Sequence, residues 1–202
     1  MTAERIKNKA VRHVLICLVL TAVYLIVSVP FKMMEIIPGF TDIRSVPLLQ
    51  PVYGIFFGIP GCLAFAFGNL FTDIIGNSLR LSSIAGFAAN FLGPFCFYLF
   101  WRVLSRKPFR LDTPKQIGKH LLLIVISAAL EALVITLFVV LWYPDVNAVV
   151  FFVTVLINGT AFPTFIGIPL IILIQEELRF TPMTRPKLSK NRMRDEDNFR
   201  KI

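Results

Sequence analysis

Long apolar stretches, separated by short segments rich in Pro, Gly or charged residues, dominate the chain up to residue 178. A helix that crosses the hydrocarbon core of a bilayer needs roughly 20 apolar residues, because each residue adds about 1.5 Å along the helix axis. The pattern predicts six such helices, over residues 11–30, 46–58, 60–76, 84–101, 120–142 and 148–174. We therefore interpret the chain as an all-α, polytopic membrane protein with a single six-helix transmembrane domain over residues 1–178.

The second stretch, residues 46–58, differs from the others because it is short and contains Pro47 and Pro51. Proline removes a backbone donor and interrupts regular helix. We expect a short or broken helix here, and such backbone is tolerated at membrane depth only where protein or a water-filled cavity covers it. In the last stretch, Pro163 and Pro169 predict kinks.

The distribution of Lys and Arg predicts the orientation. If the N-terminus is inside and the helices alternate, 18 of the 21 basic residues lie in the N-terminal arm, the connection between the fourth and fifth helices, and the C-terminal tail. Only Lys32, Arg44 and Arg80 fall elsewhere. The positive-inside rule then places both termini in the cytoplasm. Residues 179–202 are polar and charged, and we expect them to form a flexible basic tail.

Composition and motifs narrow the class of function. The chain is 56% hydrophobic, and its net charge of +9 is divided over three membrane-flanking segments, so we expect no nucleic-acid partner. It contains no P-loop, no G-x-G-x-x-G and no G-x-S-x-G motif. His13 and His120 are not grouped with acids or cysteines, so we expect no metal site. These features favour a binder or carrier without a cofactor over an enzyme.

The few polar residues inside the apolar stretches fall at one depth. A charged side chain at the centre of a membrane helix costs about 2.5–3.5 kcal/mol, so each such residue requires an explanation. With the orientation above, these residues lie in the outer half or near the middle of five helices: Gln50, Asn69, Asp73, Asn90, Glu131, Thr154 and Asn158. Polar groups that converge at one depth predict a ligand cavity open to the outside.

Spacing and neighbours extend this candidate site. Asn69, Asp73, Asn77 and Arg80 follow one another at i, i+4, i+8 and i+11, and they form one stripe if the helix continues that far. Tyr53 lies one turn beyond Gln50 and is a further candidate for the cavity wall. Trp142 is either an anchor at the membrane interface or part of the cavity rim.

A structural interpretation stands beside the functional one. A single Asn in a membrane helix often only bonds a neighbouring helix, for roughly 0.6 kcal/mol, and this applies to Asn90 and Asn158. Asp73 and Glu131 are either part of the cavity or are structural carboxyl groups, paired with a nearby arginine or protonated. Small residues at i, i+4, such as Gly54 with Gly58, predict close packing of helices.

Three short motifs after Phe40 carry a resemblance to a known family. The first is a D-x-R segment before a Pro-rich turn, here Asp42 and Arg44. The second is a G-x-x-x-G-x-x-G hairpin, here Gly54, Gly58 and Gly61. The third is a G-N-x-x-x-D element, here Gly68, Asn69 and Asp73. In these motifs, and in its length and its predicted spans, the chain resembles the S components of energy-coupling factor (ECF) transporters. The resemblance covers roughly residues 10–178.

The resemblance implies a subunit of a bacterial plasma membrane importer that binds a vitamin or related micronutrient with high affinity. It further implies an ECF transmembrane coupling subunit and two cytosolic ATPases as partners, and outer loops over residues 36–46 and 77–83 that cap the site. S components usually present an A-x-x-x-A motif on the first helix to the coupling subunit. Here Cys17 and Thr21, or the face of Ala22, take that place.

Two other functions compete with this one. The first is a stand-alone secondary transporter of a small polar solute, in which Asp73 or Glu131 carries a coupling proton. The second is a scaffold or membrane-enzyme partner, whose polar residues only hold helices together. The sequence does not identify the substrate.

The predicted site has a direct test. We expect Asp73→Asn and Asn69→Ala to weaken binding of the small molecule that co-purifies with the chain by at least about tenfold, because a lost hydrogen bond to a charged group is equivalent to about 1.5–3 kcal/mol. Isothermal titration calorimetry on the purified variants measures this. Unchanged affinity in both variants would show that the site is assigned wrongly.

Overall fold

The computed structural model of the chain describes residues 3–31, 35–37, 41–42, 44–101, 109–177 and 182. The described chain is helical apart from one short antiparallel hairpin, which confirms the predicted all-α class. Its elements are α1 (Ala3–Ser28), η1 (Val29–Phe31), β1 (Glu35–Ile37), β2 (Thr41–Asp42), η2 (Val46–Leu49), α2 (Gln50–Val52), η3 (Tyr53–Phe57), α3 (Ile59–Ile75), α4 (Ser82–Leu99), α5 (Pro114–Trp142), α6 (Ala148–Phe162), η5 (Pro163–Gly167) and α7 (Ile168–Glu176). The predicted tail, residues 179–202, lies outside the described residues except for Pro182.

Four helical stretches within the described residues are long and apolar enough to cross a membrane: Ala10–Phe31, Ser82–Leu99, Pro114–Trp142 and Ala148–Glu176. The remaining two predicted helices are shorter apolar segments, Val46–Phe57 and Ile59–Ile75. Many large apolar side chains are exposed along the long helices, as is typical of surfaces that face lipid. The chain therefore has the apolar helices of a multi-pass membrane protein.

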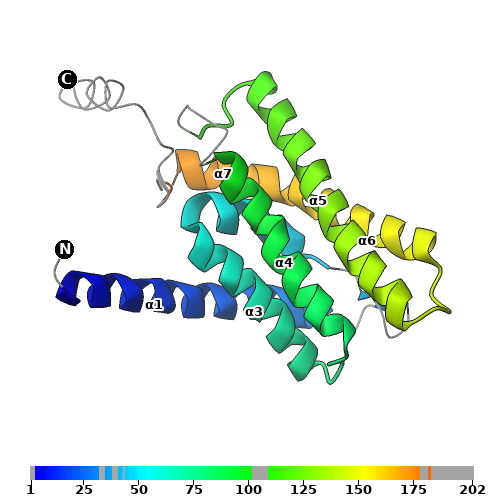
Figure 1. Cartoon of the computed structure of the whole chain (residues 1–202). Coiled ribbons are helices and arrows are strands. Elements are labelled where there is room, and N and C mark those ends of the chain that lie inside the picture. The colour runs from blue at the N-terminus through cyan, green and yellow to red at the C-terminus, as the bar shows by residue number, and fades with distance from the viewer. Residues whose placement is uncertain are drawn as a thin grey trace, which may run out of the picture.

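The helices pack in a simple sequential order. α1 contacts α3, α3 contacts α4, α4 contacts α5 and α5 contacts α6 (Figure 1). The broken segment, which we define as residues 46–57 (η2, α2 and η3), lies between these helices and contacts α4, α6 and η5. Its residues are buried except for Leu48 and Phe57, which are half-buried. The prediction of a broken helix covered by protein is confirmed.

The sequence around the broken segment explains its geometry. Pro47 and Pro51 divide it into a 3-10 turn and a short α-helical turn, and a π-helical turn follows. Gly58 then adopts φ 65° and ψ −136°, a conformation that essentially only glycine reaches without strain. The chain can thereby reverse within one residue, and α3 begins directly at Ile59.

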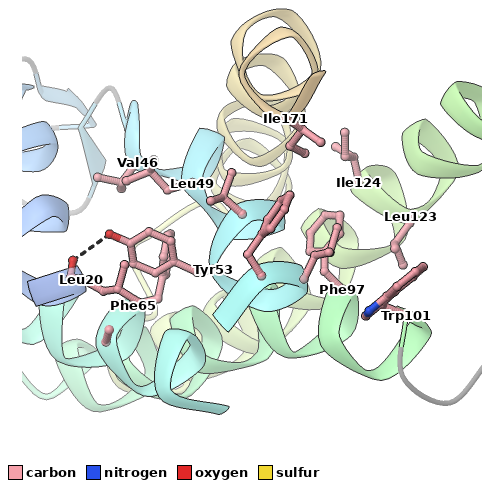
Figure 2. Packing of buried hydrophobic residues seen from close by; sticks show 14 of the residues in the cluster. Leu20, Val46, Leu49, Tyr53, Phe65, Phe97, Trp101, Leu123, Ile124 and Ile171 are labelled. Carbon is pink, nitrogen blue, oxygen red and sulfur yellow. Dashed lines mark hydrogen bonds between the residues drawn. The ribbon is translucent and has the colours of Figure 1, made fainter. Parts of the chain in front are cut away.

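Side chains of the broken segment form much of the apolar core. Figure 2 shows Val46, Leu49 and Tyr53 between residues of the surrounding helices, and the Tyr53 hydroxyl donates a 2.7 Å hydrogen bond to the Leu20 carbonyl oxygen. The Tyr53 ring meets the Phe65 ring edge-on, with ring centroids 5.6 Å apart. The segment is therefore held by α1 and α3 on one side of Tyr53, as well as by α4.

Glycines permit the closest contacts between elements. A Cβ built on Gly54 would lie 2.0 Å from the Pro94 carbonyl oxygen of α4. A Cβ on Gly68 would lie 2.4 Å from the Tyr24 ring of α1. Only glycine allows backbones to approach this closely, as the small-residue spacing predicted.

The last apolar stretch is also interrupted. The π-helical turn η5, Pro163–Gly167, separates α6 from α7, where a kink was predicted. A Cβ built on Gly167 would lie 3.0 Å from the Leu48 carbonyl oxygen, so η5 packs closely on η2. The two interrupted stretches of the chain thus meet each other inside the bundle.

Two helices begin well before the predicted residue. α1 begins at Ala3, eight residues before residue 11. α5 begins at Pro114, about two turns before residue 120, because Thr113 and Gln116 form a capping box that starts the helix in a polar region. α3 ends at Ile75, and Asn77 has a positive φ of 50°. The predicted stripe through Asn77 and Arg80 is therefore wrong beyond Asp73, because the helix does not continue that far.

The close contact at Gly54 can be tested by substitution. We expect Gly54→Ala to lower the free energy of unfolding by at least about 1–3 kcal/mol, because the new Cβ overlaps the rigid backbone of α4. Gly118→Ala is the matched control, since Gly118 is exposed in α5 and a Cβ there meets nothing within 4 Å. Thermal unfolding in detergent, followed by circular dichroism, measures the difference. Equal melting temperatures of the two variants would contradict this close contact.

Candidate functional site: a buried polar cluster

Several polar side chains lie deep inside the apolar bundle. Gln50, Asn90, Asn69 and Glu131 are only 1%, 2%, 4% and 5% exposed, respectively. We call these four residues, together with the half-buried Arg44, the polar cluster. They come from α2, α3, α4, α5 and the residues just before η2, so elements far apart in sequence meet here. Polar groups in such surroundings are stable only when they are paired.

The strongest contact in the cluster joins α2 to α5. The Gln50 Nε2 atom donates a 2.7 Å hydrogen bond to the Glu131 Oε2 atom. The Gln50 amide also lies flat against α4, because a Cβ built on Gly93 would be 2.7 Å from its Nε2 atom. One turn before Glu131, the Ser127 hydroxyl donates to the Gly93 carbonyl oxygen at 2.9 Å and ties α5 to α4. The Glu131 carboxyl group therefore bonds Gln50 at a place where α2, α4 and α5 meet.

The second contact fixes the direction of the Asn69 side chain. The Arg44 Nη1 atom donates a 3.3 Å hydrogen bond to the Asn69 Oδ1 atom. A guanidinium group has no acceptor, so the amide oxygen must face Arg44 and the amide nitrogen must point away from it. Asn69 Nδ2 lies 2.9 Å from a Cβ built on Gly86. It has no hydrogen-bond partner among the described residues, which costs about 1–3 kcal/mol for a buried donor.

One face of α4 connects these two contacts. Gly86, Asn90 and Gly93 follow at i, i+4 and i+7 and lie on the same side of the helix. The Asn90 side chain donates to the Gly86 carbonyl oxygen of its own helix at 2.7 Å. Asn69 lies against one end of this face and Gln50 against the other. We call it the glycine face of α4.

The cluster contains one guanidinium group and one carboxyl group. The Arg44 guanidinium group donates to Asn69, and the Glu131 carboxyl group accepts from Gln50. The cluster therefore offers hydrogen-bond donors at Arg44 and Asn69 and an acceptor at Glu131. This arrangement suits recognition of a polar molecule that has both kinds of group.

Beyond Gly93 the same side of α4 becomes apolar. Phe97, one turn further on, is fully buried in the core and packs against the His120 ring at 5.5 Å between centroids. Figure 2 shows Phe97 beside Trp101, Leu123 and Ile124, near the start of α5. The polar cluster thus ends at an aromatic and aliphatic layer.

The other predicted site residues lie in different surroundings. Asp73 and Asn158 are buried, on α3 one turn beyond Asn69 and on α6. Tyr53 is directed to α1 through its bond to Leu20, within the apolar core. Asp42 belongs to β2, but its side chain lies outside the described residues.

The remaining predicted residues are near the helix ends. Asn77 and Arg80 are exposed in the connection between α3 and α4. Trp142 is 49% exposed at the end of α5 and stacks on Phe138, with ring centroids 5.1 Å apart. Thr154 is half-buried, and its hydroxyl donates to the Val150 carbonyl oxygen of its own helix.

Sequence reasoning missed three residues that shape the cluster. Gly86 and Gly93 lie directly against Asn69 and Gln50, and Ser127 links α5 to α4 next to Glu131. The available signal was the position of both glycines on the same helical face as Asn90.

Comparison of the chain with protein-family models, with curated proteins and with solved structures gave no match in any of the three. Inference about function therefore starts from the residues of this chain.

The Gln50–Glu131 bond generates a stability prediction. We expect Gln50→Leu to lower the free energy of unfolding by about 1–3 kcal/mol, because it leaves the buried Glu131 carboxyl group without this donor. Glu131→Gln keeps an acceptor for Gln50 and should be milder. A double-mutant cycle of Gln50→Leu with Glu131→Leu isolates the pair energy in unfolding experiments. Additive effects would show that the two side chains do not interact.

Proposed function

We propose that this chain is the substrate-binding S component of an ECF-type importer in a bacterial plasma membrane. It captures a vitamin or related micronutrient from outside for ATP-driven uptake. The observation that carries the proposal is the polar cluster, in which Arg44–Asn69 and Gln50–Glu131 contacts are buried among apolar helices. Polar and ionisable groups inside a membrane bundle are expensive and are usually retained for binding or transport.

The proposed topology has six spans with both termini in the cytoplasm. The two short segments, Val46–Phe57 and Ile59–Ile75, complete the four longer apolar helices. Interrupted helices at membrane depth commonly form solute sites in transporters, because their backbone is shielded by protein or lines a cavity. The distribution of basic residues supports the orientation.

The proposed partners are an ECF transmembrane coupling subunit and two cytosolic ATPases, since the sequence contains no nucleotide-binding motif of its own. α1 is a suitable docking element because much of its apolar surface is exposed, including Leu18 and Val19. Thr21 is buried, and its hydroxyl bonds the Ala64 carbonyl oxygen of α3 at 3.4 Å. The exposed side of α1 that contains Ala22 is therefore the better candidate for the coupling subunit than the Cys17–Thr21 pair.

A proton-coupled secondary transporter is the second candidate. The observation in its favour is Glu131, a carboxyl group that lies 5% exposed in the middle of the longest apolar helix, α5. Intramembrane carboxyl groups are common in proton relays. This function would need no ATPase.

Mass spectrometry and uptake assays distinguish the candidates. We expect the purified chain in lipid nanodiscs to retain about one small molecule per chain, and we expect uptake only when the coupling subunit and ATPases are present, in proportion to ATP hydrolysis. Uptake by the chain alone, driven by a pH gradient and abolished by Glu131→Gln, would instead establish the second candidate. Absence of any bound solute and of any uptake would leave a scaffold role.

A further inference from the structure

We propose that the polar cluster recognises a neutral or zwitterionic molecule through a carbonyl-type oxygen that accepts a hydrogen bond from Asn69 Nδ2. The inference rests on the proposed function, because it names the chemical class bound at the same site. It starts from an amide donor that is buried, fixed in direction and unpaired among the described residues.

The unpaired donor points to the glycine face of α4 at Gly86. Among the described residues, the only atoms within 4 Å of a Cβ built on Gly86 are Nδ2 and Cγ of Asn69, apart from chain neighbours and the helix backbone. The space beside two other glycines is occupied. A Cβ on Gly93 would meet three atoms of Gln50, and a Cβ on Gly54 would meet Pro94 and Phe97. Apart from Asn69, no described side chain therefore lies against Gly86 to pair the donor.

The neighbouring groups do not supply the missing acceptor. The Gly86 carbonyl oxygen already accepts the Asn90 amide. The Asn69 Oδ1 atom accepts a hydrogen bond from Arg44. Rotating the amide group by half a turn would place its nitrogen, a donor, against the donors of Arg44. A bound molecule that presents an oxygen acceptor would pair the donor and remove the penalty of an unsatisfied buried group.

Charge limits what kind of oxygen fits. An ammonium group has no acceptor for Nδ2 and would lie near the Arg44 guanidinium group. An anion is attracted by Arg44 but must lose its hydration to enter a site enclosed by apolar helices. A neutral carbonyl group, or a zwitterion with its amino group towards Glu131, avoids both penalties.

Three probes of similar size separate these classes. Benzamide presents a neutral carbonyl oxygen, benzoate an anion and benzylammonium a cation on the same ring. Their binding to the wild-type chain in nanodiscs is measured by saturation-transfer NMR, with empty nanodiscs to subtract partition into lipid. We expect benzamide to bind at least about threefold more tightly than either charged probe.

Two variants test the location. Asn69→Asp keeps an oxygen for Arg44 but replaces the donor by an acceptor, and Gly86→Ala places a Cβ 2.9 Å from Nδ2. We expect each to weaken benzamide binding at least about tenfold, while Gly118→Ala leaves it unchanged. Gly86→Ala also raises helix propensity, so it keeps the test valid if Asn69→Asp fails to fold.

The outcomes separate this inference from the proposed function. Equal benzamide affinity in wild type and both variants overturns the inference. Stronger binding of a charged probe, or no binding of any probe, also overturns it. If a natural solute co-purifies and ATP-dependent uptake occurs, but both variants retain that solute, the importer function stands and the inference is wrong. Loss of benzamide binding in both variants, together with no uptake by the wild type, supports the inference and contradicts the importer function.

Discussion

The constraint on which this structure depends is that a polar group inside an apolar bundle must find its partner within the protein. Gln50 meets this constraint through Glu131, and it does so from a segment that is too short and too irregular to stand alone among lipids. The broken segment packs closely on α4 because Gly93 has no side chain where the Gln50 amide lies. Gly54 likewise has no side chain where the Pro94 carbonyl oxygen approaches. Close packing and polar pairing therefore support each other in the same few residues.

This coupling has a consequence for function. α4 provides the surface on which the broken segment packs and also the surface against which Asn69 lies, since Gly86 and Gly93 are on the same face. Changes that disturb helix packing at α4 will also move polar groups of the cluster. The proposed binding and the stability of the fold would therefore depend on the same helix.

Much of the fold was predictable from the sequence because membrane helices have simple signals. Apolar length located the helices, and Pro47, Pro51 and Pro163 located the interruptions. The start of α5 was missed because its first two turns are polar and depend on a local capping box rather than on hydrophobicity. The stripe beyond Asp73 was wrong because a left-handed Asn77 ends the helix, which spacing alone does not reveal.

The candidate site was predictable only in part. Intramembrane Asn, Gln and Glu residues drew attention by their cost in lipid, and several of them do meet. Which residues pair with which was not predictable, because pairing depends on the rotation of each helix about its axis. The role of Gly86 was hidden for the same reason, since a glycine becomes informative only when its neighbour across the interface is known.

The separation of Gln50 and Glu131 along the chain bears on how the protein is made. Gln50 leaves the ribosome 81 residues before its partner, which at about 5–20 residues per second is a delay of roughly 4–16 s. α4 is synthesised within that time, but until Glu131 follows there is no carboxyl group to accept the Gln50 amide. Water or the insertion machinery must shield the Gln50 amide until α5 is inserted. The centre of the bundle is therefore synthesised early but completes its polar contacts late.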